Sequence, residues 1–70
     1  MKSMNEAGYG NLLRQTRKSM GLTIEEMSER LDVSVNSLSL WEREKAYPDA
    51  IHRMVIKSVL GIDIPERNIQ

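Results

Sequence analysis

The sequence contains no cysteine, and its 70 residues include only two prolines. The absence of cysteine excludes disulfide bonds, thiolate nucleophiles and the cysteine ligands of zinc fingers and iron–sulfur clusters. Long apolar runs are also missing, since none exceeds three residues, and the N-terminus has no basic segment followed by an apolar core. We therefore expect no membrane span, no signal peptide and a cytoplasmic location.

The chain also lacks an excess of charge of either sign, because 10 Lys and Arg residues balance 10 Asp and Glu residues. A domain that binds nucleic acid usually carries a basic excess, so the overall charge counts against that function. The charges are segregated, however, with residues 1–20 mainly basic, residues 21–34 mainly acidic and a basic group after position 42. A basic rim beside a neutral surface is compatible with this distribution.

No arrangement of residues typical of catalysis or metal binding is present. His52 is the single histidine, and neither a cysteine nor a second histidine completes a ligand set. Met20, Met27 and Met54 recur at helical spacing and are expected to fill the core. Because the sequence offers no nucleophile with a base, no carboxylate pair and no phosphate-binding loop, we expect no enzymatic activity, no metal, no cofactor and no small-molecule ligand.

The apolar pattern predicts a first helix after a flexible N-terminal arm. Residues 1–8 contain few large apolar groups and are expected to form the arm. From Tyr9 to Met20 the apolar side chains recur on one helical face, and Gly21 is placed to end the helix. A chain of this length forms one domain near the lower size limit for an independent core.

Residues 23–42 have the pattern of two short helices joined by a tight turn. Thr23 and Glu26 form a capping box that begins the first of these helices. Ser34 is placed to cap the second helix, on which Trp41 is expected to face the core. The opposite face of that helix carries almost no charge, which is unusual for a solvated surface and typical of a surface that reads DNA.

This outer face of the second helix consists of Val35, Asn36, Ser39 and Leu40. The amide of Asn36 has the donor and acceptor that a bidentate contact with an adenine edge requires. Val35 and Leu40 can meet thymine methyl groups, or they can form an apolar patch for a protein partner. Ser39 either reaches a base or is small enough to let the helix enter the groove. We take all four as candidate base-reading residues.

The last helix is expected to begin at its N-cap Asp49 and to run through Leu60, with Gly61 at its end. One of its faces is apolar, and further apolar side chains widen the apolar arc beyond what one small core can bury. The first face consists of Ile51, Met54, Val55 and Val59, and the widening comes from Ile56 and Leu60.

Two arrangements can cover this excess. Either Ile62 and Ile64 fold back over the helix, or a second copy of the chain covers it. The alternation of Ile62 and Ile64 also suits a short edge strand that pairs across a two-fold axis. We expect a homodimer, with contacts at Ile56, Leu60, Ile62 and Ile64.

Many of these residues occur at the spacing of a known family. From about Tyr9 to Ile62 the chain resembles the helix-turn-helix domain of the Cro and lambda-repressor-like transcription regulators, also called the xenobiotic-response-element (XRE) family. The matching positions are Leu13, Arg17, Gly21, Leu22, Thr23, Glu26, Met27, Ser28, Leu31, Val33, Ser34, Ser37, Leu38, Ser39, Trp41, Glu42 and Pro48.

The resemblance implies an all-α fold, a compact bundle of four or five short helices with a central helix-turn-helix. The domain would cover residues 9–62, followed by a C-terminal tail at 63–70 that could contribute to a dimer. The helix near residues 35–43 would lie in the DNA major groove, and Arg17 would form an ion pair with Glu42. The candidate phosphate contacts around that helix are Thr23, Ser34, Ser37, Arg43, Lys45 and Tyr47.

Several positions depart from the family pattern. Arg53 and Lys57 occupy positions of the last helix that the family commonly buries, which indicates a rotation of that helix. Asp32 replaces the usual glycine of the turn but tolerates a left-handed backbone. Ile24 replaces a glutamine that braces a phosphate, which weakens one backbone contact. Glu44 stands where the family has glycine, and it would put a negative charge close to the phosphate path.

We therefore predict a sequence-specific double-stranded DNA-binding regulator, a small homodimeric autorepressor of phage or mobile-element type that reads a palindromic operator. Autorepression is inferred from the small size, which leaves little room for a sensor domain. The alternative is a protein-interaction module that has the helix-turn-helix fold without sequence-specific DNA binding. The zero net charge, Ile24, Leu40 and Glu44 favour that alternative.

Overall fold

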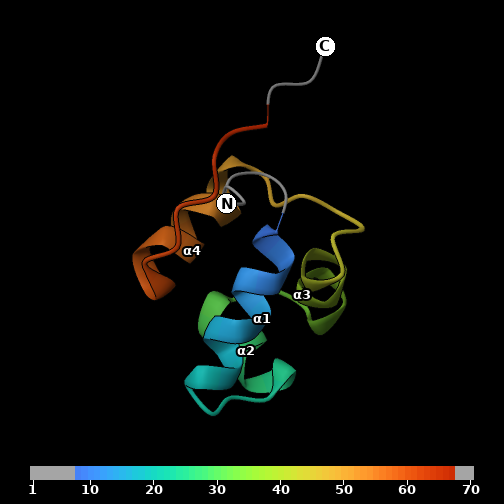
Figure 1. The fold of residues 1–70 in the computed structure, drawn as a ribbon, viewed down its shortest axis with the longest axis vertical. Helices are drawn as coiled ribbons and strands as arrows, with labels where there is room; N and C mark the ends of the chain where they lie inside the picture. Colours follow the sequence, from blue (N-terminus) through green and yellow to red (C-terminus); the bar gives the residue numbers. More distant parts are fainter. Residues whose placement is uncertain (1–7, 68–70) are drawn as a thin grey trace.

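The computed structural model describes residues 8–67, which form an all-α fold of four helices. Helix α1 packs against α3, and α2 packs against both α3 and α4 (Figure 1). The helices are α1 (Tyr9–Ser19), α2 (Ile24–Leu31), α3 (Val35–Glu42) and α4 (Ala50–Leu60). The predicted fold class is confirmed; apart from Gly8, the predicted arm lies outside the described residues. Within residues 8–67 no helix is long and apolar enough to cross a membrane.

The predicted N-caps begin three of these helices. At the start of α2 the Thr23 hydroxyl accepts from the Glu26 N–H while the Glu26 carboxylate accepts from the Thr23 N–H, at 3.1 and 2.8 Å. Ser34 caps α3 and Asp49 caps α4 in the same way through their side-chain oxygens. Each cap satisfies backbone donors that the helix leaves without an internal partner.

Left-handed residues end the helices where the sequence predicts turns. After α1, Gly21 has φ 71° and its N–H donates to the Lys18 carbonyl. Asp32 ends α2 with φ 58°, so an aspartate occupies the turn position where glycine would be unstrained. Gly61 ends α4 with φ 73°. The turn between α2 and α3 is therefore as tight as a helix-turn-helix requires.

The core contains apolar side chains from all four helices and from the C-terminal tail, residues 61–67. Its buried members are Tyr9, Leu13, Met27, Leu31, Leu38, Trp41, Ile56, Ile62 and Ile64. Two predicted core residues are exposed instead, Met20 by 41% and Met54 by 70%. Met20 is the C-cap residue of α1, beside Gly21. Met54 points away from the core because α4 is rotated relative to the predicted apolar face.

The rotation of α4 corrects the predicted dimer contacts. Ile56 faces the chain's own core, and the tail folds back so that Ile62 and Ile64 are only 6% and 5% exposed. Leu60 packs partly against the same core. These four side chains therefore complete one chain's core and do not form a free surface for a second copy. Residues 61–67 form no strand within the single chain, and the edge strand that would pair across a two-fold axis stays a prediction.

The buried tail generates a stability prediction with a matched control. Ile64→Ala is expected to lower the free energy of unfolding by about 2–4 kcal/mol, because it removes buried methyl groups and leaves a cavity. Ile51→Ala makes the same chemical change on a side chain that is 71% exposed, and should change stability by about 0.5 kcal/mol or less. Urea denaturation measures both. Equal effects of the two substitutions would contradict the placement of the tail.

Candidate nucleic-acid interface

The outer face of α3 (Val35, Asn36, Ser39 and Leu40) lies opposite the buried Leu38 and Trp41. Val35 and Asn36 are exposed, whereas Ser39 and Leu40 are half-buried. The exposed pair therefore occupies the first turn, the part of a recognition helix that reaches base edges in the major groove. Leu40 contributes a smaller apolar surface than its outward position in the sequence pattern indicates.

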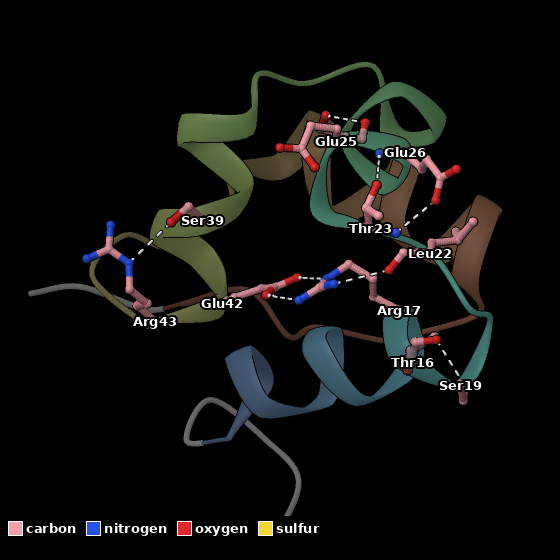
Figure 2. A network of polar contacts seen from close by, with 11 residues as sticks. Thr16, Arg17, Ser19, Leu22, Thr23, Glu25, Glu26, Ser39, Glu42 and Arg43 are labelled. Carbon is pink, nitrogen blue, oxygen red and sulfur yellow. Dashed lines mark hydrogen bonds and ion pairs between the residues drawn. The ribbon is translucent and has the colours of Figure 1, made fainter.

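Arg43 also lies on the outer face of α3, although the sequence pattern was used only to name it as a candidate phosphate contact. Its Nε donates to the Ser39 hydroxyl at 3.2 Å, so the guanidinium lies along the last turn of α3 (Figure 2). The signal was available in the spacing, because Asn36, Ser39 and Arg43 stand at i, i+3 and i+7. The structure thus places a cation at the end of an otherwise uncharged row.

Two of the candidate phosphate-contacting hydroxyls act as helix caps, and a third lies in the first turn of α3. Thr23 lies at the start of α2, and Ser34 lies at the start of α3, where its oxygen accepts from the Ser37 N–H at 3.0 Å. The Ser34 hydroxyl donates to that of Ser37 at 3.1 Å. Each of these residues lies at or just inside the N-terminus of its helix, the end that carries a positive partial charge. Lys45 is exposed in the loop that follows α3.

Tyr47 does not belong to this set. Its hydroxyl donates to the carbonyl of Pro65, and its ring lies 4.9 Å from that of Tyr9 in an edge-on contact. The Arg67 guanidinium stands 4.1 Å from the centre of the same ring. Burial raises the pKa of the neighbouring Tyr9, whose hydroxyl donates to the Ala46 carbonyl. Tyr47 therefore holds the tail against the domain, and we withdraw it as a phosphate contact.

Glu44 is turned away from the outer face of α3. Its Oε2 accepts from the backbone N–H groups of Gly8 and Gly10 at 3.1 and 3.0 Å, and so caps the N-terminus of α1. Residue 44 adopts φ 59°, a conformation that costs a non-glycine residue about 1–2 kcal/mol. Because its carboxylate is bound by α1, Glu44 is not the isolated negative charge near a phosphate path that the sequence suggested.

The closeness of α1 to α3 depends on Gly10. A Cβ atom at this position would stand 2.5 Å from the Glu42 carbonyl oxygen and 2.7 Å from that of Trp41. A real side chain would therefore push the end of α3 away from α1. Glycine permits the approach that brings the Glu44 carboxylate to the α1 backbone.

An ion pair joins the same two helices further along α1. Arg17 Nε donates to Glu42 Oε2 at 2.8 Å and its Nη2 donates to Glu42 Oε1 at 3.1 Å, which makes a bidentate pair (Figure 2). The side chains are only 14% and 6% exposed. Arg17 Nη1 also donates to the Leu22 carbonyl at 3.1 Å. The hydrogen bond to Glu42 raises the pKa of Arg17, so the guanidinium keeps its charge.

Comparison with protein families gives one result. A family model described as Helix-turn-helix matches residues 13–66, which is most of the chain and includes α2, the turn and α3. Comparison with curated proteins and with solved structures gives no match.

Breaking the ion pair on one side should destabilise the domain strongly. Arg17→Ala leaves the Glu42 carboxylate in a mostly buried position without its partner, so we expect a loss of about 3 kcal/mol in the free energy of unfolding. Arg14→Ala on the exposed face of the same helix is the control and should cost about 0.5 kcal/mol or less. A melting temperature for Arg17→Ala within a degree or two of the wild type would contradict the burial of the pair.

Two substitutions at Glu44 separate its hydrogen bonds from its backbone strain. Glu44→Ala and Glu44→Gly both remove the carboxylate from α1, but only alanine keeps the left-handed strain. We therefore expect Glu44→Ala to be less stable than Glu44→Gly by about 1 kcal/mol in urea denaturation. Equal stability, or a more stable alanine variant, would show that residue 44 does not adopt this conformation.

Proposed function

The chain belongs to the Cro and lambda-repressor-like (XRE) helix-turn-helix family, and we propose that it is a sequence-specific repressor that binds a palindromic operator as a homodimer. Membership of this family makes it a DNA-binding helix-turn-helix regulator. The finer proposal is that α3 enters the major groove and that occupancy of the operator of its own operon blocks transcription. Two symmetric copies would then read half-sites about one helical turn apart.

The observation that carries this proposal is the composition of the exposed side of α3. Asn36 stands in the first turn with Val35 beside it, and no acidic side chain interrupts the row up to Arg43. Acidic residues gather instead on α2, at Glu25, Glu26 and Glu29. A neutral row that ends in a cation suits a groove whose floor presents base edges and whose walls are phosphates.

Two kinds of contact follow from this geometry. Asn36 is proposed to bond an adenine edge, with Val35 and Leu40 against thymine methyl groups and Ser39 allowing close approach. Arg43 and Lys45, together with the hydroxyls of Thr23, Ser34 and Ser37, are proposed to contact phosphates. The first set gives sequence preference, and the second set gives affinity that depends on salt.

A protein-interaction module remains the second candidate, and particular residues favour it. The chain has zero net charge, Val35 is 39% exposed, and Leu40 is half-buried on the same helix. Such a surface can bind an apolar partner without DNA. A series of binding measurements at increasing salt separates the candidates, because phosphate neutralisation gives a steep loss of affinity and an interaction module shows little DNA binding even at low salt.

Substitutions in the base-reading set and in the phosphate-contacting set should affect DNA binding in different ways. Asn36→Ala should weaken binding to the operator by about 1–3 kcal/mol, relax the base preference at one position of each half-site and leave non-specific binding almost unchanged. Lys45→Ala should weaken binding to every sequence and reduce the slope of log K against log salt by about one unit for each lost phosphate contact. An operator selected from a random DNA pool and a shuffled duplex serve as the two probes.

Circular dichroism should show that both variants keep the wild-type fold, since both side chains are exposed. The proposal fails if Asn36→Ala preserves operator affinity and preference while a change at Val35 or Leu40 abolishes binding to a protein partner. That outcome would identify the outer face of α3 as a protein-binding surface.

A further inference from the structure

Arg43 is joined to Ser39 twice, once through its backbone and once through its side chain. Its N–H donates to the Ser39 carbonyl at 3.1 Å, and its Nε donates to the Ser39 hydroxyl at 3.2 Å. The second bond turns the arginine side chain back along the outer face of α3, as Figure 2 shows. The guanidinium is therefore held beside Ser39, about one helical turn closer to Asn36 than its own backbone is.

The other donors of this guanidinium are available for a ligand. Within residues 8–67 neither Nη nitrogen of Arg43 has a hydrogen-bond partner, and no ion pair involves this residue. The acids that flank it in the sequence, Glu42 and Glu44, are bound instead by Arg17 and by the start of α1. Arg43 therefore presents two parallel N–H donors with a positive charge behind them.

We propose that Arg43 reads a guanine in the major groove, with its two Nη groups donating to O6 and N7, and that Ser39 is the residue that positions it. Guanine places two acceptors side by side in this groove, whereas adenine places a donor beside its N7, thymine offers one acceptor and cytosine offers a donor. The inference rests on the proposed function and changes one role in it, since Arg43 moves from the phosphate contacts to the base-reading set.

The bond to Ser39 favours a base over a phosphate as the ligand of Arg43. A phosphate on the wall of the groove is satisfied by a point charge from many directions, so an exposed loop lysine such as Lys45 suits that role. A base edge has to be met in its own plane. A guanidinium that Ser39 already orients loses less rotational freedom when it binds in that plane.

The separation of Asn36 and Arg43 sets the distance between the two bases that they read. Seven residues of α-helix span about 10 Å, and the return of the guanidinium towards Ser39 shortens this distance. Successive base pairs are about 3.4 Å apart. We therefore expect each half-site to contain a guanine about two or three base pairs from the adenine that Asn36 reads.

The test removes the acceptor on the DNA and the donor on the protein, separately and together. The probe is the operator that wild-type protein selects from a random pool, with this guanine replaced in both half-sites by 7-deazaguanine, which lacks N7. Wild-type protein should bind the modified operator at least about fivefold more weakly. Arg43→Ala should weaken binding to the unmodified operator by a similar factor and should lose nothing more on the modified one.

Lys45→Ala is the matched control, because it removes a cation that is proposed to contact a phosphate. This variant should keep the full loss that wild-type protein shows on the modified operator. The inference is overturned if 7-deazaguanine does not weaken wild-type binding, or if Arg43→Ala loses as much on the modified operator as the wild type does.

Repeating the selection with variants at position 39 tests the positioning role. Ser39→Ala should relax the preference for this guanine and leave the preference for the adenine intact, whereas Ser39→Thr keeps a hydroxyl and should restore the guanine. Added to Arg43→Ala, Ser39→Ala should change nothing further. An unchanged guanine preference in Ser39→Ala, or a change at a different base, overturns the role of Ser39.

The proposed function and this inference fail in different ways. A pool that yields no preferred duplex contradicts the proposed function and the inference with it. An operator whose selected bases are the same for Arg43→Ala as for the wild type, with binding weakened equally to every sequence, contradicts only the inference and returns Arg43 to the phosphate contacts. Circular dichroism should show the wild-type fold in each variant, since Arg43 is exposed and Ser39 is half-buried.

Discussion

The ion pair between Arg17 and Glu42 fixes the direction in which α3 presents its outer face. Glu42 is the last residue of α3, and a bidentate pair at 2.8 and 3.1 Å holds that end of the helix against α1. Charge-assisted bidentate bonds restrict both distance and angle, so they set the rotation of α3 as well as its position. The absence of a side chain at Gly10 and the Glu44 carboxylate on the start of α1 extend the same contact. The exposure of Asn36 and Arg43 depends on this junction.

A chain of 70 residues has few apolar side chains with which to build a core. The tail, residues 61–67, adds some of them. Ile62 and Ile64 complete the core, and the Tyr47 hydroxyl on Pro65 holds the segment in place. Because the tail supplies these side chains, α4 turns Ile56 inward and leaves Ile51 and Met54 outside. One rotation therefore both closes the core and produces an uncovered apolar row.

Local signals in the sequence predicted most of the fold. The capping box at Thr23, the Ser34 and Asp49 caps and the turn at Asp32 depend on neighbouring residues, and all lie where they were expected. The rotation of α4 was indicated by Arg53 and Lys57, which occupy positions that the family commonly buries. Periodicity alone does not indicate it, because both sides of that helix are apolar. The bond from Glu44 to the α1 backbone spans 34 positions and depends on a left-handed conformation that glutamate rarely adopts. At the candidate interface the helix and its outer face were predicted, and the bond between Ser39 and Arg43 is a local contact that helical spacing permits. The inward turn of Tyr47 required tertiary geometry.

The central claim is that the outer face of α3 recognises a base sequence, and the most direct test is a ratio of two affinities. The wild-type protein would be titrated against a duplex selected from a random pool and against a shuffled duplex of the same composition, at one fixed salt concentration. A sequence-reading regulator should bind the selected duplex at least about 10³-fold more tightly. A ratio near one, or no binding to either duplex at low salt, would contradict the claim.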